Sequence, residues 1–177
     1  FGGLQYVLVG SEKLPESVAF AFEDIFGIRP LEFYMCNECS PVVSANARDF
    51  RAVGFRQVAA RRGKVGHPLP GVSVRVVDVE TGRPVSPNVP GILLVKGPNV
   101  MKGYLGEPEE TANVLHDGSY TTRDVAIVGE DGFLTMITDR PNTRSNEFYC
   151  SKADHDTPSC SAPSGRDENS TKNKARA

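Results

Sequence analysis

Two cysteines and their neighbours are the first candidates for chemistry in this chain. Residues 33–41 read FYMCNECSP, which places Cys36 and Cys39 at the C-x-x-C spacing. That spacing is typical of zinc sites and of thiol redox centres. Tyr34 precedes the cysteines and Glu38 lies between them. An aromatic ring can pack on a ligand, and a carboxylate can hold a hard cation. The stretch therefore predicts either a cysteine site or a site built from the cysteines' neighbours.

The surroundings of the cysteine pair argue against a metal or redox site. A structural zinc site needs four ligands. The other cysteines, Cys150 and Cys160, lie in a polar segment near the C-terminus, and His67 and His116 are isolated in the sequence. A redox C-x-x-C is expected to open a helix, whose dipole lowers the thiol pKa. Here Pro41 follows and the next residues, VVS, have an extended pattern. A C-x-x-C metal or redox protein is therefore the least favoured hypothesis.

The N-terminal part has the pattern of a βαβ unit. Leu4–Val9 is a short apolar run that ends at Gly10, as expected of a buried strand. A helix is predicted to begin at Pro15 and to end before Gly27, because proline favours the first turn and glycine the position after the last. The apolar positions of this helix are Val18, Phe22, Ile25 and Phe26. Leu31–Tyr34 is the second predicted strand, and ligands of such units bind in the loops after the strands.

The middle of the chain has the pattern of a β-rich unit. Valine alternates with polar residues over 72–76, and ETG at 80–82 predicts a turn. Further strands are predicted at Ile92–Val95, Val125–Val128 and Phe133–Ile137, with Asp131-Gly132 as a hairpin signal. The predicted fold class is α/β: a partial βαβ layer followed by a small β-barrel-like subdomain and a disordered C-terminal tail.

Composition and charge divide the chain and narrow its class. The 177 residues carry a net charge of −2, which gives no reason to expect nucleic acid as a partner. No apolar run is long enough for a membrane segment. We predict three divisions. Residues 1–63 form the end of an α/β subdomain, residues 64–140 form a β-rich subdomain, and residues 141–177 form a C-terminal tail. The last contains no Leu, Ile, Val, Met or Trp, so we expect it to be disordered.

The first residue and the cysteines of the chain suggest where the natural protein starts and in which compartment it lies. The first residue is Phe1, so we expect the natural start to lie upstream. Four cysteines without a secretion signal suggest a reducing compartment. We therefore expect a cytoplasmic protein, with membrane association of the parent protein left open.

Three motifs together resemble the adenylate-forming enzymes. Their signature is Tyr-Gly-x-Thr-Glu, and this chain has Tyr34-Met35-Cys36-Asn37-Glu38. GILLVKGPNVMKGYLGEPEET (91–111) is similar to the family's Gly-Glu-Leu, Gly-Tyr-Leu and Pro-Glu-x-Thr run. DGSYTTRDVAIVGEDGFLTMITDR (117–140) is similar to its Thr-Gly-Asp, Asp-Gly-Phe and Gly-Arg run. The wording VLVGSEKLPESV, FGIRPLEFY and ECSPVVSAN looks closest to the acyl-[acyl carrier protein] synthetase branch, often fused to a 2-acylglycerophosphoethanolamine acyltransferase of phospholipid metabolism.

The resemblance implies a reaction and its partners. The family ligates a carboxylate to a thiol: ATP and the carboxylate give an acyl-adenylate and pyrophosphate, and the acyl group then passes to the thiol. ATP/AMP and Mg²⁺ are the implied cofactors. A fatty acid, and an acyl carrier protein or CoA, are the implied partners.

The resemblance also assigns site residues. Tyr34 corresponds to the ring that stacks on adenine, Asn37 to the signature threonine that meets the phosphate, and Glu38 to the magnesium-binding glutamate. The loop Gly10-Ser11-Glu12 corresponds to the glycine-rich adenine loop. Two further residues complete the set, Asp124 as acceptor for both ribose hydroxyls and Arg140 at the inter-domain junction. We expect the Tyr34 ring and the Asp124 carboxylate on one cleft wall, about one nucleoside length apart.

Several positions depart from the family pattern. Met35 and Arg123 replace motif glycines, and Ile92 replaces the acid of Gly-Glu-Leu. A left-handed backbone at Met35 would cost roughly 1–2 kcal/mol. The family's triphosphate loop should lie upstream of Phe1, and its lysine-bearing domain should follow Arg140. We therefore expect a fragment of an ATP-dependent acyl-activating ligase, inactive alone. The alternative is a non-catalytic nucleotide- or acyl-binding module.

Overall fold

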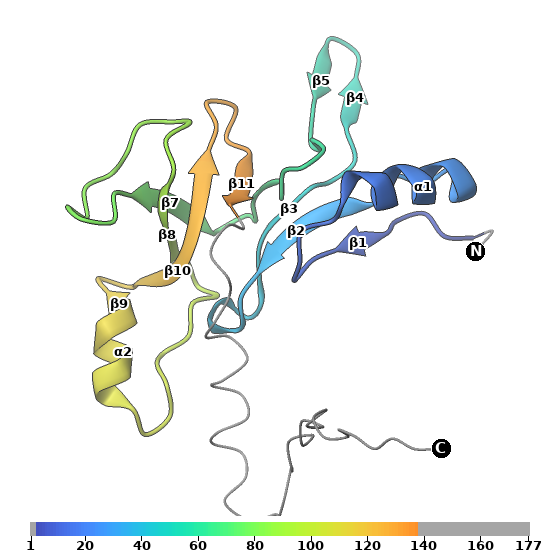
Figure 1. The fold of residues 1–177 in the computed structure, drawn as a ribbon. Coiled ribbons are helices and arrows are strands. Elements are labelled where there is room, and N and C mark those ends of the chain that lie inside the picture. Colours follow the sequence, from blue (N-terminus) through green and yellow to red (C-terminus); the bar gives the residue numbers. More distant parts are fainter. Residues whose placement is uncertain (1–2, 138–177) are drawn as a thin grey trace, which may run out of the picture. The chain divides into compact units, whose positions relative to one another are not determined.

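A computed structural model of the chain describes residues 3–137 (Figure 1). The chain divides into two units, residues 1–140 and 141–177. The predicted disordered tail and Arg140 lie outside the described residues. Among the residues that are described, no helix is long and apolar enough to cross a membrane.

The first sheet contains the predicted βαβ unit. Its strands are β1 (Leu8–Val9), β2 (Leu31–Met35), β3 (Val42–Ala45) and β6 (His67–Pro68), in the order β1-β2-β3-β6. β1 pairs with β2 in parallel, and helix α1 (Glu16–Phe26) connects them. The βαβ prediction is therefore confirmed, although the first strand is shorter than the apolar run. β6 extends this sheet beyond residue 63.

Helix α1 begins and ends where the sequence predicts. Pro15 precedes its first residue, and Gly27 caps its C-terminus at a φ of 66°, a left-handed conformation that glycine adopts without strain. None of the helix residues is buried, however. Val18 and Ile25, two of its apolar positions, are 54% and 73% exposed. The spacing of apolar residues thus predicts the helix correctly, but it does not predict how exposed the apolar side chains of the helix are.

The second sheet is an open, antiparallel half-barrel. Its order is β11-β10-β8-β7, and β9 pairs with the far end of β10. The strands are β7 (Ser73–Val77), β8 (Gly91–Lys96), β9 (Leu115–His116), β10 (Ser119–Val128) and β11 (Leu134–Ile137). The predicted strands in this part, and the hairpin turn before β11, are confirmed. Helix α2 (Pro108–Val114), which the sequence analysis did not predict, precedes β9.

One hydrophobic core joins the two sheets. Tyr34 and Val43 of the first sheet and Cys39 of the turn after β2 form this core with Val114 of α2. The buried residues of the second sheet in the same core are Val76, Leu93, Val95, Tyr120, Ala126 and Leu134. Backbone hydrogen bonds reinforce the junction, since Val65 donates to the Leu134 carbonyl at 2.8 Å and Leu134 donates to the Gly66 carbonyl at 2.9 Å. The shared core fixes the end of β2 against the half-barrel.

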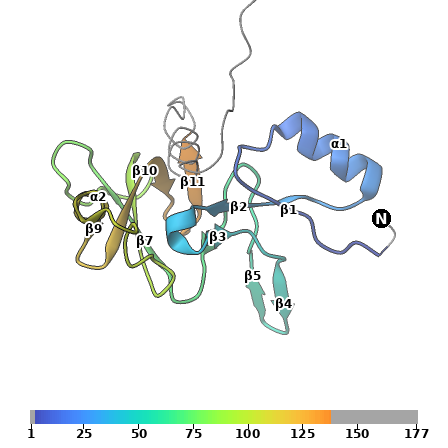
Figure 2. The same ribbon diagram turned by 90° about the horizontal axis from the view of Figure 1, so that it is seen from below.

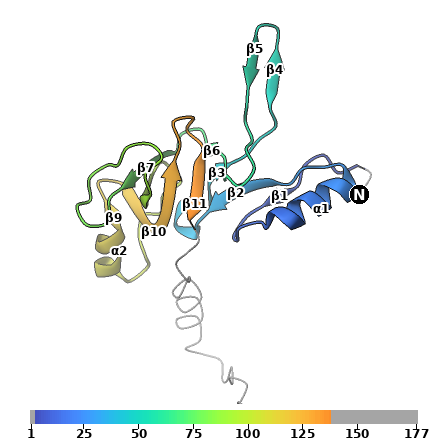
Figure 3. The same ribbon diagram turned by 45° about the horizontal axis from the view of Figure 1, so that its top comes forward.

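A short hairpin stands apart from both sheets. Strands β4 (Phe50–Ala52) and β5 (Phe55–Gln57) pair only with each other. In Figure 1 and in the turned views of Figures 2 and 3, this hairpin extends away from the first sheet and away from the half-barrel. The sequence analysis placed no strands here.

Candidate functional site

The most informative contact joins two motifs that are 90 residues apart. The Tyr34 hydroxyl donates a hydrogen bond of 2.6 Å to Oδ2 of Asp124. Tyr34 is 8% exposed, whereas Asp124 is an exposed residue. The two groups therefore lie on the same side of the molecule, as expected. They touch, however, instead of standing a nucleoside length apart.

A bulge in β10 points Asp124 at Tyr34. Thr121 pairs with Leu94 and Val125 with Ile92, so three residues of β10 stand opposite Leu93 alone. The Thr122 hydroxyl donates to the Leu93 carbonyl at 2.9 Å, and the Asp124 amide donates to that hydroxyl at 3.1 Å. Such bulges re-aim side chains. Thr122 thus anchors the bulge, and Asp124 is lifted out of the ladder.

The ionisation of the pair is set by its surroundings. Partial removal of the carboxylate from water raises the pKa of Asp124, the hydrogen bond from Tyr34 opposes this, and the charge of Glu38 adds to it. Burial and the charge of Asp124 raise the pKa of the Tyr34 phenol. The phenol therefore stays protonated and acts as the donor. Oδ1 of Asp124 accepts no hydrogen bond within the described residues.

Glu38 is held by residues 101–104, which belong to the stretch that resembles the family's Gly-Tyr-Leu motif. It lies in a single 3-10 turn, Asn37–Cys39, directly after β2. The Tyr104 hydroxyl donates to Oε1 of Glu38 at 2.9 Å, and the Met101 amide donates to the Glu38 carbonyl at 2.7 Å. Asn37 is exposed. The Gly-Tyr-Leu motif was the signal for Tyr104, but only the fold reveals its partner.

The cysteines contribute packing and a thiol contact. Cys39 is fully buried and Cys36 half-buried, and both are free thiols. A hydrogen bond with Cys39 and burial raise the pKa of the Cys36 thiol. Within residues 3–137, no three His, Cys, Asp or Glu side chains gather as a metal-binding group. Cys39 is thus a core residue.

The loop Gly10-Ser11-Glu12 lies beside Phe33 and Met35, the two residues that flank Tyr34 in the sequence. A Cβ on Gly10 would be 2.6 Å from the Phe33 ring, so the close approach that requires glycine is to Phe33. Ser11 adopts a φ of 74°, and its hydroxyl lies 3.8 Å from the Met35 sulfur. Glu12 is exposed. The loop therefore reaches the strand that carries Tyr34 through that strand's neighbouring residues.

Comparison with known proteins identifies the family. The family model described as AMP-binding enzyme matches residues 1–105. The chain belongs to this family. Over 133 residues it is 40% identical to the long-chain-fatty-acid–CoA ligase of Bacillus subtilis strain 168, covering 75% of this chain and 22% of that ligase.

Two solved structures of MatB share the fold of this chain. Apo MatB from Rhodopseudomonas palustris has a TM-score of 0.67 and 32% identity, covering 76% of this chain and 25% of that one. ATP-bound MatB from the same organism has a TM-score of 0.64 and 32% identity, covering 74% and 24%. The chain thus spans about a quarter or less of the length of these relatives.

The structure shows the backbone conformation at the two positions where this chain replaces a motif glycine. Met35 lies in β2 and is not among the positive-φ residues, so its backbone carries none of the strain that a left-handed conformation would bring. Arg123, which replaces the glycine before Asp124, does adopt a φ of 64°. The left-handed conformation is costly for any side chain, and glycine avoids that cost.

Restoring glycine at this position should stabilise the chain. We expect Arg123→Gly to raise the free energy of unfolding by about 0.5–1 kcal/mol, because relief of strain outweighs the extra entropy of glycine in the unfolded state. Urea denaturation measures the change. Thr121→Gly, at a regular position of the same strand, serves as control and should lower stability. A loss of stability in Arg123→Gly would contradict the assigned strain.

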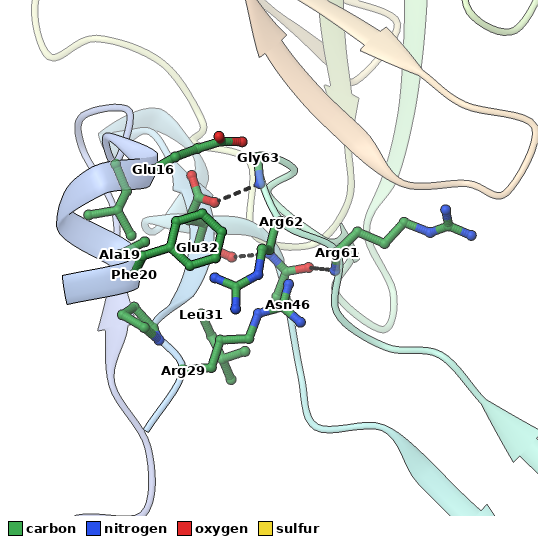
Figure 4. A pocket seen from close by; sticks show the side chains of 12 residues that line it. Glu16, Ala19, Phe20, Arg29, Leu31, Glu32, Asn46, Arg61, Arg62 and Gly63 are labelled. Atoms are coloured by element: carbon green, nitrogen blue, oxygen red, sulfur yellow. Dashed lines mark hydrogen bonds between the residues drawn. The ribbon is translucent and has the colours of Figure 1, made fainter. Parts of the chain in front are cut away.

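A pocket between α1, β2 and residues 61–63 contains none of the predicted site residues (Figure 4). Several of its polar groups contact other protein groups. The Glu32 carboxylate accepts from the Gly63 amide at 3.1 Å, and the Asn46 side chain accepts from the Arg61 amide at 3.0 Å. Arg62 pairs with Glu23 and covers the Phe20 ring at 4.4 Å. These contacts tie α1 to the loop and indicate a structural role.

Proposed function

We propose that this chain forms the ribose-binding wall of an AMP-forming acid–thiol ligase. The contact between Tyr34 and Asp124 carries the proposal, because it brings two family motifs to one exposed point. The free Oδ1 of Asp124 faces no protein donor among the described residues, and a carboxylate oxygen suits a ribose hydroxyl. Only 8% of Tyr34 is exposed, which leaves little ring for adenine. Its first role is therefore to hold Asp124 in place.

The turn Asn37–Cys39 would face the phosphates. Mg²⁺ is commonly held by one or two carboxylates together with substrate phosphates. Glu38 fits that use, because Tyr104 contacts only its Oε1 and leaves Oε2 without a hydrogen bond in the described part of the chain. Tyr104 would orient the carboxylate, and Asn37 would offer an amide to a phosphate oxygen. A bound Mg²⁺ would neutralise phosphate charge during adenylation.

The acid and thiol substrates are proposed from the relatives. The name of the B. subtilis relative supports a long-chain fatty acid and CoA. The narrower resemblance to the acyl carrier protein branch makes acyl carrier protein the second candidate acceptor. This chain covers 22% of the length of that ligase.

A chimera tests this function. The matched segment of the B. subtilis ligase is replaced by the corresponding residues of this chain, and palmitate-dependent exchange of pyrophosphate into ATP is measured. We expect exchange above a no-acid blank, followed by thioester formation with CoA or with acyl carrier protein in parallel reactions. A chimera with native-like circular dichroism and AMP binding but no exchange would instead support the non-catalytic binding module.

A further inference from the structure

The β4–β5 hairpin carries an unusual distribution of exposed side chains. Its register is Phe50 opposite Gln57, Arg51 opposite Arg56 and Ala52 opposite Phe55. Every residue from 50 to 57 is exposed, and Val53 at the tip is 106% exposed. Nothing in the described chain covers these residues.

The two faces of the hairpin differ in chemistry. Side chains alternate along strands, so Phe50 and Phe55 share one face, and their ring centroids are 6.2 Å apart. These rings are 56% and 57% exposed. Arg51 and Arg56 oppose each other on the other face. Like charges directly opposite each other destabilise a hairpin, so the pair is unfavourable without an anionic partner.

The basic charge extends to both sides of the hairpin. Residues 48–64 contain six basic residues and one acid, Asp49, in a chain whose net charge is −2. The basic residues are Arg48, Arg51, Arg56, Arg61, Arg62 and Lys64. The last three pair with acids at the base of the hairpin. Arg56 has one exposed partner, Asp49 at 3.7 Å, and Arg51 makes no ion pair within the described residues.

We propose that this hairpin docks on an anionic lipid surface. Val53 and the two phenylalanine rings would enter the headgroup boundary, where aromatic side chains are favoured. Arg48, Arg51 and Arg56 would meet the anionic headgroups. A protein partner fits less well, because a specific interface buries about 800 Å² on each side and this hairpin is a narrow projection. The inference does not depend on the nucleotide site.

A single tryptophan reports the docking. The chain contains no tryptophan, so Val53→Trp gives an unambiguous signal. Vesicles of phosphatidylcholine with 30% phosphatidylglycerol should shift its emission to the blue, and brominated lipids should quench it. Val79→Trp is the matched control, since Val79 is 58% exposed but lies between Asp78 and Glu80. Its emission should not change.

Two double variants separate the contribution of the arginine charges to vesicle binding from that of the phenylalanine rings. Arg51→Gln with Arg56→Gln should lower the vesicle partition coefficient by roughly 25-fold, about five-fold per arginine. Phe50→Ser with Phe55→Ser should lower it by roughly 10-fold or more. Both are exposed changes, and circular dichroism checks that the fold is kept.

Four results would overturn the proposal. The first is an unchanged emission of Val53→Trp on adding vesicles. The second is equal binding to pure phosphatidylcholine, and the third is vesicle binding that neither double variant weakens. Emission that is already blue without lipid would also overturn it, because it would show that protein covers the hairpin.

Discussion

An Asp124→Ala substitution in the chimera is expected to weaken AMP binding by about 10- to 150-fold. Hydrogen bonds to a charged group contribute roughly 1.5–3 kcal/mol, which converts to that range. Alanine removes the free Oδ1 that we assign to the ribose hydroxyls, together with the acceptor of the Tyr34 hydroxyl. Isothermal titration with AMP measures the change.

Tyr34→Phe is the matched control for this prediction. It removes the same internal hydrogen bond of 2.6 Å but keeps the ring and the carboxylate. We expect AMP affinity to stay within about three-fold of the parent chimera, because the carboxylate that we assign to the ribose hydroxyls is still present and only its internal hydrogen bond is lost. If Tyr34→Phe weakened binding as much as Asp124→Ala, the carboxylate would be acting only on protein structure, contrary to its assigned role.

A Gly66→Ala substitution is expected to destabilise the chain by about 4 kcal/mol or more. Gly66 adopts a φ of 82°, and an added Cβ would lie 1.9 Å from the backbone of Ala45. Backbone atoms cannot move aside as a flexible side chain can. The Gly66 carbonyl also accepts the hydrogen bond from Leu134 that joins the two sheets. Urea denaturation followed by circular dichroism measures the loss.

Gly63→Ala distinguishes the cost of steric overlap from the cost of the left-handed backbone conformation. Gly63 has a φ of 68°, but an added Cβ would meet nothing within 4 Å. We expect a cost of only about 1–2 kcal/mol, from the left-handed conformation alone. Equal losses in the two variants would show that steric overlap at Gly66 is relieved at no cost, in conflict with the tight junction described above.

The regular elements could be predicted because their patterns are local. Alternating valines in 72–76, the Asp131-Gly132 turn, and the cap residues Pro15 and Gly27 each depend on neighbours in the sequence. The hairpin at 50–57 was missed because its strands are three residues long and carry no buried face. Alternation is a weak signal without burial.

The site could be predicted only in part. The motifs predicted Tyr34, Glu38 and Asp124 as site residues, but they did not predict which contacts these residues make. Asp124 reaches Tyr34 through a bulge whose register is set by pairing with β8, a non-local property. The partner of Glu38 is Tyr104, 66 residues away. Both contacts depend on a core shared between two sheets, which no local pattern reveals.

The most direct test of the ribose-binding role is a nuclear magnetic resonance titration of the 177-residue chain with AMP and with 2′,3′-dideoxy-AMP. We predict saturable shifts of the Tyr34, Glu38 and Asp124 amides with AMP, and clearly weaker binding of the dideoxy analogue, which lacks both ribose hydroxyls. Equal affinities for the two ligands, or shifts that avoid Tyr34 and Asp124, would contradict the account.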